Sequence, residues 1–167
     1  DPRIGGSEPH IGTVDVVDVS DPTAPVRTAQ LALPSEPTSV AVNGGLVAVA
    51  VPAPVKTDPG QVLFFRGGVQ VGAVTVGSLP DMVTFTPNGK LLAVANEGEP
   101  NSYGLADSVD PEGSVSIITT APFRAPGAEG PSGSPQPVET IRFTDFDAGG
   151  LRARELPAGV RIFGPGA

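Results

Sequence analysis

A repeat of roughly forty residues is the feature that most limits how this chain can fold. The segment that begins at Pro37 reads PTSVAVNGGLVAVAV, and the segment that begins at Pro80 reads PDMVTFTPNGKLLAVAN. The two prolines are 43 residues apart, and the apolar positions fall in the same order in both copies. Self-similarity at this period is typical of proteins built from stacked supersecondary units. We therefore expect each copy to form one unit that packs against the next.

Each copy contains runs that are typical of β-strands. An Asn-Gly pair separates the first two runs, and it favours a tight hairpin because both residues tolerate a positive φ. The second run is nearly all apolar, as expected for a strand that is buried on both faces. No segment has a convincing helical period. The predicted strands are 38–42, 45–51, 61–66 and 69–76 in the first copy, and 82–86, 90–96, 114–119 and 138–143 in the second.

Four-stranded antiparallel units that repeat at roughly 40–50 residues describe the blades of a β-propeller. The sequence therefore predicts an all-β propeller fragment with two fairly complete blades and parts of two more, at 12–33 and 151–167. A ring needs roughly 4–8 blades to close. We expect the remaining blades of the propeller, from the same parent protein or another chain, to be partners of this one. A β-sandwich is the alternative that the same strands allow.

The domain organisation follows from composition. Residues 1–11 are expected to be an irregular N-terminal segment, and residues 12–167 a single partial propeller domain. Within it, the stretch 124–137 reads RAPGAEGPSGSPQP. Such a composition cannot bury apolar surface, so it predicts a flexible insertion. Because open blades expose sheet faces and edges, we expect the isolated chain to be marginally stable or to aggregate.

Charge and residue usage exclude several classes of function. The formal net charge is −8, which disfavours binding to nucleic acid because phosphates are repelled. There is no cysteine, so neither a disulfide framework nor a thiolate metal site is possible. No apolar run approaches the roughly 18 residues of a membrane span. His10, the single histidine, lies in the irregular segment, which disfavours a Ser-His-Asp triad.

Propeller topology brings one set of polar side chains together. The loop that leads into the first strand of a blade and the loop after its second strand emerge at the same mouth of the channel. We therefore expect Asp81 to meet Asn96, Glu97 and Glu99 on one rim. Carboxylate and amide oxygens suit a hard cation such as Ca²⁺. The alternative is that Glu97 and Glu99 are turn residues whose side chains are solvated, and both interpretations stay open.

The corresponding loop of the preceding blade carries Lys56. An ammonium group close to a cation would bind a phosphate or carboxylate ligand as a point charge. An ordinary exposed lysine in a loop is the alternative.

Three segments resemble the choice-of-anchor I proteins. They are LPDMVTFTPNGKLLAVANEGEPN at 79–101, VDPEGSVSII at 109–118 and GVRIFGPGA at 159–167, and the resemblance extends over about residues 12–167. It implies a seven-bladed-type propeller, export to an extracellular, periplasmic or cell-surface location, and an acidic site that holds a metal. The last segment resembles a family motif and contains Arg161, a second candidate for anion binding.

Two functions are compatible with these observations. The first is an extracellular propeller with a metal-dependent site that hydrolyses phosphoesters, because such proteins often carry an alkaline phosphatase-like label. A metal there would polarise the phosphoryl oxygen and generate hydroxide. The second is a non-catalytic surface module for adhesion or envelope structure, since a fold alone does not determine function.

Overall fold

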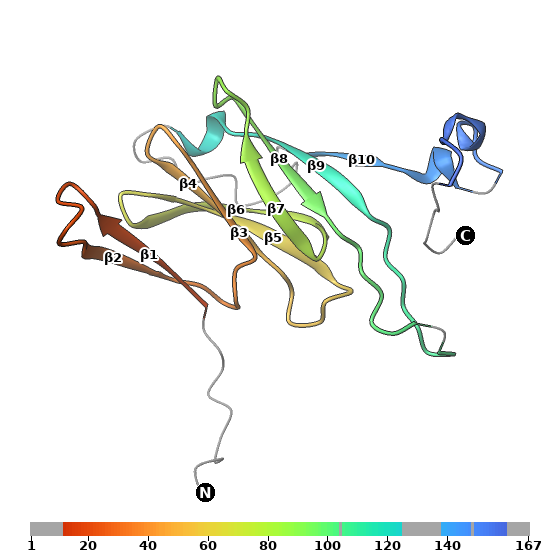
Figure 1. Cartoon of the computed structure of the whole chain (residues 1–167), viewed down its shortest axis with the longest axis horizontal. Coiled ribbons are helices and arrows are strands. Elements are labelled where there is room, and N and C mark those ends of the chain that lie inside the picture. Colours follow the sequence, from red (N-terminus) through yellow and green to blue (C-terminus); the bar gives the residue numbers. More distant parts are fainter. Residues whose placement is uncertain (1–11, 104, 125–137, 148, 160–167) are drawn as a thin grey trace, which may run out of the picture.

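A computed structural model describes residues 12–103, 105–124, 138–147 and 149–159 (Figure 1). These residues form ten β-strands and three short 3-10 helices, which confirms the all-β prediction. The strands are β1 (Thr13–Asp18), β2 (Val26–Ala32), β3 (Ser39–Asn43), β4 (Leu46–Val51), β5 (Pro59–Arg66), β6 (Val69–Ser78), β7 (Pro80–Phe85), β8 (Leu91–Asn96), β9 (Ser114–Thr119) and β10 (Val138–Arg142). The 3-10 helices are η1 (Ala121–Phe123), η2 (Thr144–Phe146) and η3 (Ala153–Glu155).

Three predictions concern residues that the structure does not describe. They are the irregular segment at 1–11, residues 125–137 of the flexible insertion, and residues 160–167 of the last partial blade. Among the residues that the structure describes, no helix is long and apolar enough to cross a membrane.

Two four-stranded antiparallel sheets, β3-β4-β5-β6 and β7-β8-β9-β10, follow chain order, and β1 and β2 form a separate pair. The first sheet turns between β3 and β4 at Gly44 and Gly45, whose φ angles of 57° and 76° suit a two-residue hairpin. The two sheets share one register, because Leu46 pairs with Arg66 where Leu91 pairs with Thr119. The sequence repeat is therefore a repeat of structure.

The β3–β6 sheet is the middle layer of three. On one face Leu46, Ala48 and Ala50 of β4 are buried against the β7–β10 sheet. On the other face Val49 and Val51 are buried in a second core with residues of the β1–β2 layer. A two-layer sandwich leaves one face of each sheet to solvent, whereas here the middle sheet is covered on both faces. This is the arrangement expected of successive blades.

The first strands of the two large sheets lie side by side (Figure 1). The Thr38 hydroxyl, just before β3, donates a hydrogen bond to the carbonyl of Pro80 in β7. The amide of Val83 in β7 donates in turn to the hydroxyl of Ser39, at 3.2 Å. Direct bonding between first strands is expected where blades converge on a shared axis.

At the opposite end of the sheets, Arg124 joins the two hairpin turns. Its guanidinium donates to both the carbonyl and the side-chain oxygen of Asn43, at 3.2 and 3.0 Å, and to the carbonyl of Gly89, at 2.7 Å. Phe123, just before it, is fully buried and stacks on Phe64 of the middle sheet with ring centroids 4.1 Å apart. Phe123 and Arg124 follow β9, so their contacts hold the β7–β10 sheet against the β3–β6 sheet.

Candidate functional site

One end of the sheets gathers the loops 33–38, 52–58 and 97–113, which we call the rim. β3 and β7 begin there, and β4 and β8 end there. The amide of Glu97 donates to the carbonyl of Leu79 at 2.9 Å, which holds the start of the longest loop against the link between the two sheets. Leu79 itself has a φ of 50°, a left-handed conformation that is strained for a residue with a side chain.

The backbone brings Asp81 and Glu97 to the same end of the β7–β8 pair. Pro80 is opposite Asn96 in the register, and Asp81 lies in the irregularity that follows. Both carboxylates are exposed to solvent. Glu97 therefore lies on the rim, and Asp81 lies at the start of β7 directly beside it.

Asn96 points elsewhere. Its side chain is only 3% exposed and lies between the two large sheets. Its Nδ2 donates to the hydroxyls of Ser114 and Ser116 at 3.1 and 2.9 Å, while its Oδ1 has no hydrogen-bond partner among the described residues. Gly77 of β6 makes room for it, since a Cβ at that position would be 2.8 Å from the Asn96 side chain. Asn96 is thus part of the contact between the sheets.

Glu99 and Lys56 form an ion pair, with Nζ 3.1 Å from Oε2. The two side chains are 35% and 38% exposed, and they join the loop 97–113 to the loop 52–58 of the neighbouring sheet. Sequence reasoning gave these residues separate roles, as a cation ligand and an anion-binding group. The topology places both loops at one end, but the pairing of the two side chains is visible only in three dimensions.

Within the described ranges, no three side chains of His, Asp or Glu gather closely enough to hold a metal ion. Calcium binding by Asp81, Asn96, Glu97 and Glu99 stays a prediction, as does anion binding by Lys56. Arg161 and His10 lie outside the described residues.

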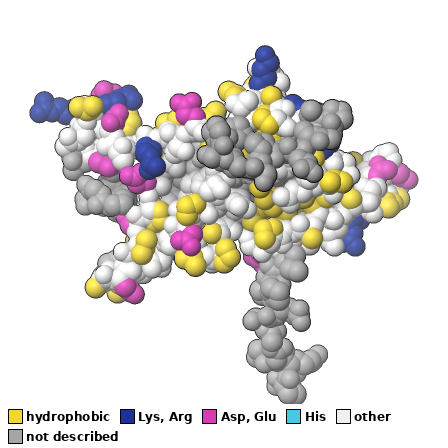
Figure 2. All heavy atoms as spheres, turned by 180° about the vertical axis from the view of Figure 1, so that it is seen from behind, with side chains coloured by type: hydrophobic (Ala, Val, Ile, Leu, Met, Phe, Trp, Pro, Cys, Tyr) yellow, Lys and Arg dark blue, Asp and Glu magenta, His cyan; other side chains and the backbone are white. Residues whose placement is uncertain are grey.

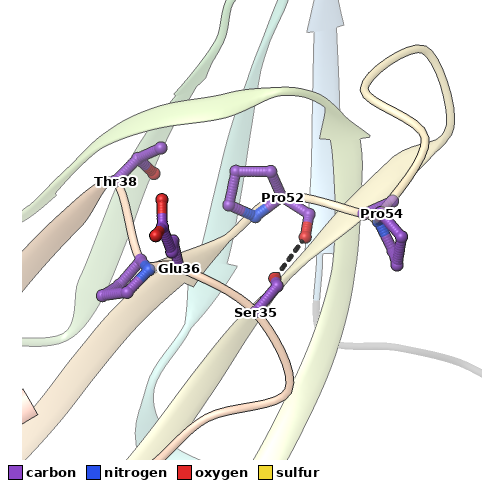
Figure 3. Close-up of a pocket in the computed structure, with 7 residues that line it drawn as sticks. Ser35, Glu36, Thr38, Pro52 and Pro54 are labelled. Carbon is purple, nitrogen blue, oxygen red and sulfur yellow. Dashed lines mark hydrogen bonds between the residues drawn. The ribbon is translucent and has the colours of Figure 1, made fainter. Parts of the chain in front are cut away.

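Sequence reasoning missed a hollow of about 450 Å³ at the rim. Figure 3 shows the Ser35 hydroxyl directed at the carbonyl of Pro52, to which it donates at 2.8 Å. The lining is Ser35, Glu36, Pro37, Thr38, Pro52, Ala53 and Pro54. Three prolines stiffen this wall because each fixes its own φ, and their clustering in two loops was the available signal. Glu36 supplies the single carboxylate.

Charged side chains are sparse on the described part of the face seen from behind. Seen from behind, Lys, Arg, Asp and Glu side chains stand singly or in small groups around hydrophobic areas (Figure 2). The described part of this face shows no continuous basic patch of the kind that tracks a phosphate backbone.

Comparison with known families decides the classification. The choice-of-anchor I domain matches residues 5–167. The chain belongs to the choice-of-anchor I family. This choice-of-anchor I domain is accordingly a surface-associated or secreted protein, and the resemblance noted in its sequence is confirmed. Neither a curated protein nor a solved structure matches it significantly.

Proposed function

We propose that this choice-of-anchor I domain is part of a non-catalytic, extracellular β-propeller that presents its rim as a binding surface. The observation that carries the proposal is the state of the polar groups at the rim. Glu99 and Lys56 neutralise each other, and the hydroxyls of the hollow donate to backbone carbonyls. The rim is therefore organised by contacts between its own loops.

Hydrolysis by a side-chain nucleophile needs a different arrangement. A serine or threonine hydroxyl becomes nucleophilic when an adjacent general base accepts its proton. Ser35 and Thr38 instead donate to the carbonyls of Pro52 and Pro80, which cannot act as bases. These bonds support a structural role for both hydroxyls.

Calcium is the second part of the proposal. Asp81 and Glu97 supply exposed carboxylates at one end of the same strand pair. Glu99 would supply a third carboxylate if it released Lys56 and bound the cation instead. Replacing Lys56 by Met would free Glu99, so Ca²⁺ would raise the melting temperature more in Lys56→Met than in the unmodified chain.

The test measures turnover and calcium-dependent stability in one preparation. We expect no hydrolysis of p-nitrophenyl phosphate above the blank, with Ca²⁺ or with chelator. We also expect Ca²⁺ to raise the melting temperature. At a free Ca²⁺ concentration of 100 times Kd, the free energy of unfolding is expected to increase by about 2.7 kcal/mol. This rise would be lost in Glu97→Gln and kept in Glu139→Gln, an exposed carboxylate on β10.

Turnover that disappears in Glu97→Gln and persists in Glu139→Gln would overturn the scaffold proposal in favour of a phosphoesterase. A melting temperature that ignores Ca²⁺ would remove the calcium part alone.

A further inference from the structure

The face of the β7–β10 sheet that points away from the middle sheet, here the outer face, is mostly apolar. Strand alternation assigns the side chains, because Leu92 and Val94 of β8 and Ile118 of β9 pack on the middle sheet. Leu91 is 38% exposed and Ile141 is 47% exposed. By this alternation the outer face carries the apolar residues Met82, Leu91, Ala93, Ala95, Val115, Ile117 and Ile141, together with the polar residues Thr84, Thr119 and Glu139.

The middle sheet shows what happens to this face elsewhere in the repeat. Leu46 and Ala48 occupy the positions of Leu91 and Ala93, because they pair with Arg66 and Phe64 where the later residues pair with Thr119 and Ile117. Leu46, Ala48 and Phe64 are fully buried against the β7–β10 sheet. Along β8 and β9 the outer face thus carries the same apolar pattern as a face that is covered by a neighbouring sheet.

A hollow of about 490 Å³ extends this equivalence. Its lining is Asn88, Gly89, Lys90, Leu91, Thr119, Thr120, Ala121 and Arg124. On the middle sheet, the corresponding turn binds the Arg124 guanidinium through Asn43. Phe123 stacks beside it on Phe64, whose counterpart on the outer face is Ile117, two residues from the lining residue Thr119. Five of the lining residues, Asn88 to Leu91 and Thr119, correspond to residues 43–46 and 66 of the middle sheet. The hollow is therefore the counterpart of the position that Arg124 occupies on the middle sheet.

We infer that the outer face docks a further four-stranded unit of the same repeat, which places an aromatic side chain on Ile117 and inserts its following basic residue into this hollow. The inference rests on the propeller part of the proposed function. The occupant is identified by continuity, because the contact between the two large sheets, advanced by one repeat, predicts a cover of aliphatic side chains for the outer face. The Asn88 and Gly89 turn would then meet the basic residue, as the preceding turn meets Arg124.

A tandem duplication tests this with the chain's own sequence. Residues 77–143 are repeated directly after Phe143, so that Gly77, Ser78 and Leu79 lead into the second Pro80 as they do between β6 and β7. Since the chain has no cysteine, one introduced thiol reports burial without background. In the single chain, Leu91→Cys is expected to react readily with Ellman's reagent, and Leu46→Cys, its buried counterpart, to stay unreactive.

In the duplicated chain, the cysteine at the first copy of position 91 is expected to become as unreactive as Leu46→Cys, while the one in the second copy stays reactive. Adding Phe123→Ala in the second copy is expected to restore reactivity at the first. An unprotected first copy would overturn the inference. Protection that is unaffected by Phe123→Ala would overturn the placement of the aromatic side chain on Ile117.

Two other occupants give distinct results. Protection of Leu91→Cys in the single chain at every concentration would mean that the chain covers this face itself. Protection that grows with protein concentration would mean that a second copy does. Either result overturns the inference, and neither bears on turnover or calcium at the rim.

A second measurement applies if the duplicated chain does not fold, which reactivity of Leu46→Cys within it would reveal. The N-acetylated, amidated tetrapeptide Ala-Pro-Phe-Arg has the sequence of residues 121–124. At millimolar concentration it is expected to shift the amide resonances of residues 88–91 and 119–121 in the single chain, whereas Ala-Pro-Ala-Arg is not. Equal shifts with both peptides, or none with either, would overturn the assignment.

Discussion

Replacing Arg124 by alanine removes a side chain that binds the hairpin turns of both large sheets. Its guanidinium donates to Asn43, to Gly89 and to the Thr120 hydroxyl, at distances of 2.7 to 3.2 Å. Its charged centre also lies 5.6 Å from the centre of the Phe85 ring. A hydrogen bond to a charged group contributes roughly 1.5–3 kcal/mol. Because Arg124 is only half-buried, water replaces part of what is lost, and we expect Arg124→Ala to cost about 2–3 kcal/mol.

That loss corresponds to a fall of about 4–12 °C in melting temperature for a domain of this size. Thermal unfolding followed by circular dichroism measures it, with Arg154→Ala, an exposed arginine of η3, as the matched control that changes stability by less than about 0.5 kcal/mol. Arg124→Lys keeps the charge but loses the fork, so it is expected to recover less than half of the difference. The effect is expected to persist in 1 M salt because the acceptors are neutral. A melting temperature for Arg124→Ala equal to that of the control would refute the reasoning.

Three further measurements examine other contacts. A double-mutant cycle with Lys56→Met and Glu99→Gln is expected to give a coupling of about 0.5 kcal/mol that vanishes in 1 M salt, and a salt-independent coupling would contradict a half-exposed pair. The Thr23 hydroxyl and amide hold the pKa of Asp21 below its ordinary value of 3.8, so Thr23→Val is expected to raise that pKa in a carbon-13 titration. Because the folded-state pKa is lowered, the stability that Asp21 contributes is present above pH 3.8 and is lost as the pH falls through the folded value. Gly77→Ala is expected to destabilise the chain by about 1–3 kcal/mol because its Cβ would press on the facing sheet, and unchanged denaturant unfolding would argue against this close approach.

Strand positions could be predicted because each depends on local chemistry. The predicted strand 114–119 matches β9, and the other predicted strands differ from the observed ones by one or two residues at their ends. Turn residues punctuate the apolar runs, and the registers repeat because the sequence does. The apolar residues of both copies share one buried core, so the local strand signals agree with the way the two copies pack.

The rim could be predicted only as far as topology reaches. Loop order was enough to place Asp81 and Glu97 at one end of a strand pair. The partner of Glu99 was not predictable in the same way, because Lys56 belongs to the other copy of the repeat. Whether the two side chains are close enough to pair depends on how the two sheets are oriented relative to each other. Pairing between side chains of different units depends on distances that no local pattern encodes.

Asn96 shows where the strand pattern itself loses information. Alternation along β8 puts Asn96 on the same face as Leu92 and Val94, and that face is the one buried against the middle sheet. The pattern could not identify this face beforehand, because Leu91 and Ala93 on the other face are apolar as well. A strand with two apolar faces is expected where both become covered. The lack of polar alternation that hid the orientation of Asn96 is therefore the same property from which we infer that a further unit covers the outer face.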